Sequence, residues 1–168
     1  GNSGDNVLWG RGGSDTLMGG AGADRFAYTG SNEGGDGITD FVSGVDKIQV
    51  SALGFGGGLV AGGSVTLISG AAPVTSGTGG QFLYNTTNGQ LYWDADGTGV
   101  SATTLIATLQ GAPTLSASDF VVTDGSTNPL TVGDGDIEPM AMLAKDADPA
   151  PQILPAWVGG ARNVHGLD

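Results

Sequence analysis

Hydrophobic side chains recur at every ninth position over the first 27 residues of the chain. Residues 1–9, 10–18 and 19–27 align without a gap, with glycine at the first and fourth positions of each copy. Six residues of each copy predict a glycine-rich turn, and three predict a short strand whose middle side chain points inward. The side chains at this eighth, inward position are Leu8, Leu17 and Phe26.

After the repeats, the pattern predicts further strands joined by loops. Six segments are rich in β-branched and aromatic residues, which favour strands. They are residues 47–50, 64–68, 81–85, 90–94, 105–109 and 119–123. The turn signal TTNG at 86–89 predicts a hairpin over 81–94. Residues 54–63 and 71–80 are expected to be loops, and no helix is predicted before residue 137.

The repeats alone offer only a thin core. One deeply buried apolar side chain contributes about 1.5–3 kcal/mol. Ordering the backbone costs roughly 1–2 kcal/mol for each residue, and each such side chain serves a repeat of nine residues. Apolar burial therefore does not offset the entropy of these turns, and another interaction has to stabilise them.

The charge of the chain indicates what that interaction is. There are 17 acidic residues against 5 lysines and arginines, a formal net charge of −12, so few acids can pair with a protein cation. Nucleic acid is disfavoured as a partner because phosphate contacts need a basic surface. The absence of cysteine excludes disulfides, thiolate metal sites and thiol catalysis. A divalent metal ion is the expected partner.

The sixth position of each repeat carries the candidate ligands, which are Asn6, Asp15 and Asp24. The nonapeptide G-G-x-G-x-D-x-U-x is typical of calcium-binding β repeats, and calcium takes about 6–8 oxygen ligands, including carboxylates and backbone carbonyls. Turns eighteen residues apart are expected to stack, so turn 1–6 would share an ion with turn 19–24, and turn 10–15 with the segment after Ala27. Asn6 lacks a charge, which predicts a weaker first site. The other candidate turn residues are Gly1, Ser3, Gly10, Gly12, Gly13, Gly19, Ala21 and Gly22.

The alternative interpretation of these residues is a glycine-rich flexible linker. Three copies in strict register, each with an inward apolar residue, argue against it.

The repeats resemble the RTX repeats of type I secreted bacterial proteins. Three further segments, DGITDFVSGVDKIQVSAL, QLYWDADGTG and LIATLQGAPTLSASDFVV, extend the resemblance to the C-terminal domain of serralysin-type metalloproteases over about residues 1–123.

The resemblance implies an all-β fold, in which a parallel β-roll of RTX nonapeptide repeats continues into a β-sandwich-like capping domain, with an extended C-terminal tail. The corresponding ranges are 1–45, 46–123 and 124–168. The resemblance also implies that Asp36 and Asp40 help to close the last calcium sites, with Glu33 as a weaker candidate.

The resemblance further implies export through a type I channel and folding on calcium outside the cell, so that the protein is secreted or lies at a bacterial cell surface. No amino-terminal signal peptide or run of about 18 apolar residues is present, so no transmembrane segment is expected and the chain is expected to be the carboxy-terminal piece of something longer. Two features depart from the serralysin pattern. No protease domain is present, and a proline-containing segment follows the terminal-looking residues 119–122.

The segment DADGTG at 94–99 leaves two interpretations open. It begins like a calcium loop, but the twelfth position is Leu105 rather than the glutamate of an EF-hand. The other interpretation is a turn rich in aspartate and glycine between two strands.

No catalytic residue is predicted. The chain has no HExxH and no G-x-S-x-G, and its one histidine is His165 in the tail. We therefore expect a non-catalytic calcium-binding module. Two alternatives remain open: a structural or interaction subunit, such as a surface-layer, adhesin or accessory component that docks on a protein partner through residues 124–168, and the C-terminal fragment of a secreted hydrolase.

Overall fold

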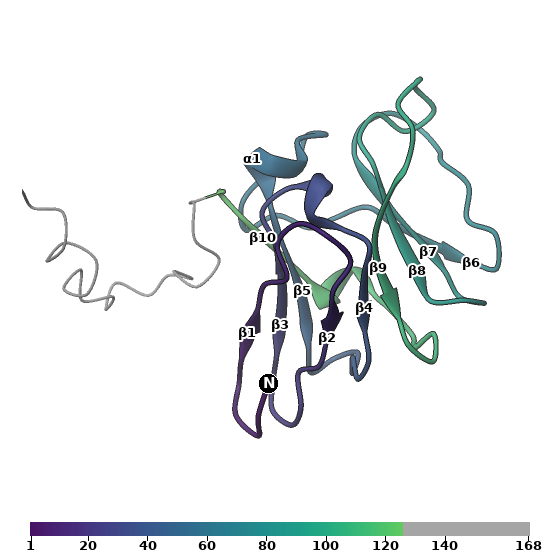
Figure 1. Ribbon diagram of the computed structural model, residues 1–168. Helices are drawn as coiled ribbons and strands as arrows, with labels where there is room; N and C mark the ends of the chain where they lie inside the picture. Colours follow the sequence, from purple (N-terminus) through teal and green to yellow (C-terminus); the bar gives the residue numbers. More distant parts are fainter. Residues whose placement is uncertain (126–168) are drawn as a thin grey trace, which may run out of the picture. The chain divides into compact units, whose positions relative to one another are not determined.

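The computed structural model describes residues 1–125, and strands dominate their regular structure (Figure 1). Four parallel strands form the first sheet, in the order β1 (Val7–Leu8), β3 (Arg25–Tyr28), β5 (Lys47–Ser51) and β10 (Phe120–Thr123). The second sheet has the order β2 (Thr16–Leu17), β4 (Asp36–Ile38), β9 (Thr104–Leu109), β8 (Gln90–Asp94), β7 (Gln81–Asn85) and β6 (Leu67–Gly70). The predicted all-β class is therefore confirmed.

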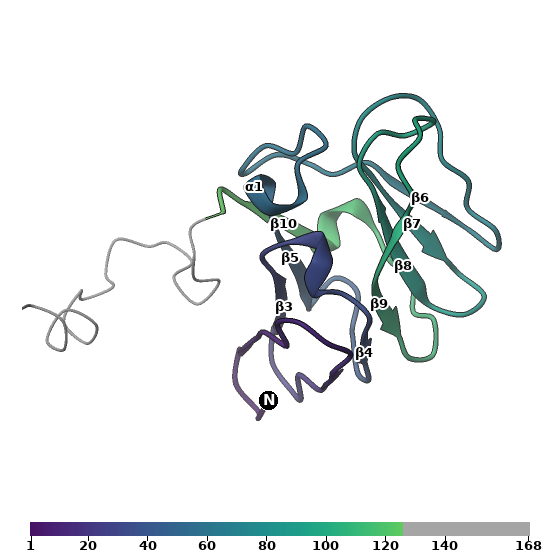
Figure 2. The same cartoon turned by 45° about the horizontal axis from the view of Figure 1, so that its top comes forward.

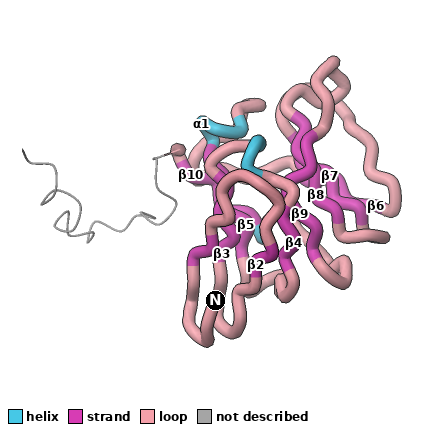
Figure 3. Tube along the Cα trace, in the orientation of Figure 1, coloured by secondary structure: helices cyan, strands magenta, loops and turns pink. Residues whose placement is uncertain are grey.

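The first five strands alternate between the two sheets, so the chain winds from one sheet to the other and back (Figure 2). Val7 pairs with Arg25, eighteen residues later, as the repeat predicts. The next pairings are Thr16 with Gly37 and Arg25 with Lys47, because extra residues enter the later turns. Strands in the repeats are short and the loops between them are long, as Figure 3 shows. The predicted stacking of turns is confirmed.

Inward side chains at the eighth repeat position form one column in each sheet. The column of the first sheet contains Leu8, Phe26, Ile48 and Phe120. The column of the second contains Leu17, Ile38 and Leu109. Leu8 and Leu17 are partly buried, whereas the later members are buried. In each column, the member from the earliest repeat is therefore the most exposed.

The strands after residue 46 supply an aromatic core that the repeats lack. Phe82 is fully buried, with ring centroids 4.6 Å from Phe120 and 4.7 Å from Trp93. Phe55 packs edge-on against Trp93 at 5.5 Å. Rings at these separations add to the free energy of area burial alone. The turns of the repeats are thus built onto the edge of a conventional hydrophobic core.

Most predicted strands are confirmed, including the hairpin of β7 and β8 with its turn at 86–89. The strand predicted at 64–68 begins instead at Leu67 and ends at Gly70, because it pairs in parallel with β7 from Leu67 opposite Phe82. The predicted boundary between 45 and 46 falls inside both sheets, since β5 pairs with β3 and β4 pairs with β9.

The prediction that no helix precedes residue 137 is wrong. A short helix, α1, spans Ala52–Phe55, and 3-10 turns span Ser31–Glu33 and Ala117–Asp119. The Ser51 hydroxyl accepts the N–H of Gly54 at 3.0 Å and caps α1, while Phe55 anchors its end in the core. These segments are too short to produce a helical hydrophobic pattern.

Two expectations lie partly or wholly beyond this range. The extended tail was predicted for residues 124–168, of which 126–168 are outside the described residues. Among the described residues, no helix is long and apolar enough to cross a membrane.

We predict that truncating the aromatic core destabilises the protein more than truncating the first repeat. Phe82→Ala should lower the free energy of unfolding of the calcium-loaded chain by about 3–5 kcal/mol, because it leaves a buried cavity. Leu8→Ala should cost less than about 2 kcal/mol, since Leu8 is only partly buried. Urea denaturation measures both, and an equal or larger loss for Leu8→Ala would contradict this ranking.

Candidate metal-binding turns

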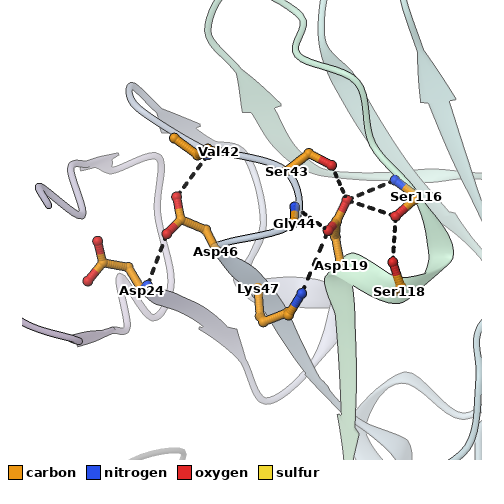
Figure 4. Close-up of polar contacts among 9 residues, drawn as sticks. All are labelled: Asp24, Val42, Ser43, Gly44, Asp46, Lys47, Ser116, Ser118 and Asp119. Atoms are coloured by element: carbon orange, nitrogen blue, oxygen red, sulfur yellow. Dashed lines mark hydrogen bonds and ion pairs between the residues drawn. The ribbon is translucent and has the colours of Figure 1, made fainter. Parts of the chain in front are cut away.

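The sixth-position residues of stacked turns are connected to one another through the backbone. Asn6, Asp24 and Asp46, here called the position-six ladder, lie immediately before β1, β3 and β5. The N–H of Asn6 donates to Oδ1 of Asp24 at 2.9 Å. The N–H of Asp24 in turn donates to Oδ1 of Asp46 at 2.9 Å, a contact that Figure 4 shows. In the second sheet, the N–H of Asp15, just before β2, donates to Oδ1 of Asp36, the first residue of β4, at 2.9 Å. One carboxylate oxygen thus fixes each turn to the next.

The other oxygen of three of these carboxylates is buried without a hydrogen-bond partner among the described residues. These atoms are Oδ2 of Asp15, Asp24 and Asp36. Asp24 and Asp36 are 1% and 0% exposed. A buried carboxylate oxygen that has lost its water is costly unless a cation or a donor replaces it. A positive ion bound at these oxygens would therefore offset the cost of their burial.

Burial at this site also changes the proton affinity of neighbouring groups. Burial raises the pKa of the Asp36 carboxyl above its usual range, although the N–H of Asp15 opposes the shift. Burial, followed by the charge of Asp36, raises the pKa of the Tyr28 hydroxyl far above its usual value. Tyr28 therefore stays neutral, and its hydroxyl is a hydrogen-bond donor beside the Asp36 carboxyl, which opposes the effect of burial on Asp36.

Glycine at the first repeat position makes room for these oxygens. A Cβ at Gly10 would lie 2.9 Å from Oδ2 of Asp15 and 3.1 Å from Oδ2 of Asp36, so the two unpartnered atoms flank the same point. A Cβ at Gly19 would collide with Oδ2 of Asp24. The recurring glycine is thus explained by the close approach of the sixth-position side chain.

The donor set consists of oxygen atoms. Within residues 1–125, no group of three or more acidic, histidine or cysteine side chains gathers to hold an ion by itself. Backbone carbonyls must therefore complete the coordination, and stacked turns bring them close: a Cβ at Gly1 would collide with the carbonyl of Gly19, and one at Gly22 would lie 2.8 Å from that of Gly4. Carboxylates mixed with carbonyls suit calcium, so the residues present fit this ion.

Asp36 and Asp40, which were both predicted to help close the last calcium sites, lie in different surroundings. Asp36 lies against Asp15, as expected, but Asp40 lies beyond the other end of β4. Its two oxygens accept the N–H groups of Gly19 and Gly20 at 2.9 and 2.8 Å. Asp40 therefore closes turn 19–24 through hydrogen bonds and leaves no buried oxygen without a partner.

The weaker candidates are also in different surroundings. Glu33 accepts the indole N–H of Trp9 at 3.0 Å and the N–H of Thr29 at 2.7 Å. Asn6 Oδ1 already accepts the N–H of Asn2 at 2.6 Å. Ser3 is exposed, and a Cβ at Gly12 or Gly13 would meet no atom within 4 Å. The placement of Asn6 agrees with a weaker first site, which stays a prediction.

Asp46 belongs to the position-six ladder and was missed by the sequence analysis. Its signal is a degenerate fourth copy, with Gly44 at the fourth position, Asp46 at the sixth and Ile48 at the eighth. Nine residues after Asp24 the chain has Glu33, but the turn that contains Ser31–Glu33 is three residues longer than a repeat. Asp36 therefore takes the sixth position in that turn.

Protein groups alone close the last stacked turn (Figure 4). Asp119 is fully buried and accepts the Ser43 hydroxyl at 2.7 Å and the N–H groups of Gly44 and Ser116, each at 2.9 Å. Lys47 Nζ lies 3.7 Å from its Oδ1. Burial pushes the pKa of Asp119 upward, but these hydrogen bonds outweigh burial and hold the pKa below its usual range.

Comparison with known proteins agrees with this geometry. Residues 1–26 match the family described as the RTX calcium-binding nonapeptide repeat (4 copies). A search of curated proteins found no match. The amino-terminal turns are therefore RTX repeats, their ion is Ca²⁺, and the chain carries a calcium-binding RTX segment.

We predict that Asp15→Ala and Asp24→Ala weaken calcium binding more than Asn6→Ala. Each aspartate substitution removes a charged ligand with a buried unpartnered oxygen, whereas Asn6 contributes a neutral oxygen that already accepts a hydrogen bond. Calorimetric titration of the three variants measures the affinities. Equal losses for all three would contradict the ranking of the sites.

We also predict that Asp119 stabilises the fold in a pH-dependent way. Because its pKa is lower in the folded chain, its contribution is present above the usual carboxyl range and is lost as the pH falls through the folded pKa. Asp119→Ala should lower the free energy of unfolding at pH 7 by about 2–4 kcal/mol. In the variant, the free energy of unfolding should also decrease less steeply as the pH is lowered. Urea denaturation with saturating calcium measures this loss.

Ser118→Ala is the matched control for Asp119→Ala. It alters the same 3-10 turn but removes only a hydroxyl contact with Ser116. A loss of stability as large as that of Asp119→Ala would show that the carboxylate is not the stabilising group.

Proposed function

We propose that this chain is a non-catalytic calcium-binding module of a type I secreted bacterial protein, which folds and is stabilised on the calcium outside the cell. In this interpretation, the strands that alternate between two sheets are a parallel RTX β-roll. The strands from β6 to β10 are its β-sandwich-like cap. The observation that carries the proposal is the set of buried, unpartnered carboxylate oxygens in the stacked turns.

The two oxygens of one aspartate have different tasks. Oδ1 accepts an N–H from the preceding stacked turn and thereby sets the position of the carboxylate. Oδ2, held over a glycine α-carbon, is left to bind the ion. A turn that has gained its ion therefore presents an ordered carbonyl and N–H surface to the next turn, so binding and folding proceed together.

Without the ion, the same aspartates oppose folding. The chain carries a net charge of −12, and the Oδ2 atoms of the buried carboxylates lose water and gain no partner among the described residues. An acidic, glycine-rich segment in this state stays expanded, which suits passage through an export channel. The higher calcium concentration outside the cell then supplies the stabilisation, about 2.7 kcal/mol for a site when free calcium is a hundred times its Kd.

We predict that the β-structure of the repeats depends on calcium. In excess chelator the far-UV circular dichroism of the chain should lose part of its β signal and its thermal midpoint should fall, and added calcium should restore both. The double variant Asp15→Asn/Asp24→Asn is the matched control, since it should respond little to calcium. A native chain that keeps its full signal and midpoint in chelator would contradict the proposal.

A further inference from the structure

A second group of carboxylates lies outside the repeats, in the loop after β8. Asp94 is 1% exposed, and its Oδ1 accepts the N–H groups of Asp96 and Gly97 at 3.0 and 2.9 Å. Asp96 accepts the N–H of Ser101 through Oδ2 at 3.1 Å. The remaining oxygens, Asp94 Oδ2 and Asp96 Oδ1, are buried without a hydrogen-bond partner in the part of the chain that the structure describes.

The two carboxyl groups are close together. The N–H of Ser101 donates to Asp96, and the carboxyl of Asp94 lies within hydrogen-bonding reach of Asp96. A positive ion between two such adjacent carboxyl groups, one of them buried, would stabilise their ionised forms. The sequence has no lysine or arginine between Lys47 and Lys145, and Lys47 is paired with Asp119. Within residues 1–125, the chain therefore offers no basic side chain from β6 to β10.

A third polar side chain reaches the same loop from the neighbouring strand. Gln81 is the cross-strand partner of Asp94 and is 1% exposed. Its Nε2 has no hydrogen-bond partner and would lie 3.2 Å from a Cβ at Gly97. The amide can turn over and direct Oε1 toward the loop, at the loss of one 3.3 Å hydrogen bond from the N–H of Ser76.

Glycines also lie close to polar atoms in this loop. A Cβ at Gly99 would collide with Oδ2 of Asp96, the oxygen that accepts the N–H of Ser101. Gly97 has φ +69°, and its Cβ would lie 2.5 Å from the carbonyl oxygen of Gly77. Glycine thus lets a carboxylate and a carbonyl approach the backbone closely at this second place.

We propose that Asp94 and Asp96, with the amide of Gln81, form an additional cation site for a hard divalent ion, best met by calcium. The oxygen donors favour calcium over transition metals, which prefer nitrogen or sulfur ligands. A bound ion joins the end of the β7–β8 hairpin to the loop at 94–101. The site is separate from the stacked turns and rests on its own residues.

Calorimetric titration of the full chain with calcium tests the site. Asp96→Asn should bind one calcium ion fewer than the native chain, with the remaining affinities unchanged. Val100→Ala, an exposed substitution in the same loop, is the matched control and should bind the native number. An unchanged number and affinity of ions in Asp96→Asn would overturn the inference.

A luminescence measurement keeps the test decisive if Asp96→Asn folds poorly. Terbium replaces calcium and is excited through a nearby tryptophan, and Trp93 directly precedes Asp94. Trp93→Phe should remove one component of the terbium signal that calcium displaces, and an unchanged signal would overturn the site. Asp15→Asn separates this result from the proposed function, because its loss of an ion concerns only the RTX turns.

Discussion

The structure of the repeats depends on the different environments of the two oxygens of a single carboxylate. One oxygen accepts a backbone N–H from the preceding stacked turn, and the other is buried over a glycine with no partner among the described residues. The first contact makes the turns stack in register. The second oxygen is buried without a partner in this part of the chain, and this burial costs free energy. Burial of apolar side chains does not offset this cost, because Leu8 and Leu17 are only partly buried. We therefore propose that calcium binding and folding of these turns are one process.

The strands that follow the repeats change the balance of forces along the same two sheets. After the partly buried Leu8, the inward column of the first sheet is buried, with Phe26 and Ile48 at 0% and Phe120 at 8% exposure. At the last turn, Lys47 and hydrogen bonds to Asp119 supply what calcium would supply in the earlier turns. We propose that the first turns depend on an ion, whereas protein groups stabilise the later strands, on which the first turns stack.

Much of the strand pairing was predictable from the sequence, because glycine spacing and inward apolar positions are local signals. The nine-residue period predicted the pairing of Val7 with Arg25, and the TTNG signal predicted the hairpin. The register beyond residue 27 was not predictable by counting, since three additional residues move the ligand position from Glu33 to Asp36. The hydrogen bonds of Asp40 to Gly19 and Gly20 were likewise not predictable, because they depend on which end of β4 Asp40 follows. Asp46 was missed because its copy has Phe41 in place of the first glycine.

Hydrogen exchange of individual backbone amides tests the central claim most directly. The N–H groups of Asn6 and Asp15 donate to the carboxylates of Asp24 and Asp36, which would bind calcium, and the N–H of Asp24 donates to Asp46 in the next turn. With calcium they should exchange slowly, and in chelator they should exchange rapidly while amides of the β7–β8 hairpin remain protected. Slow exchange of the three turn amides in the absence of calcium would contradict the coupling of ion binding to folding.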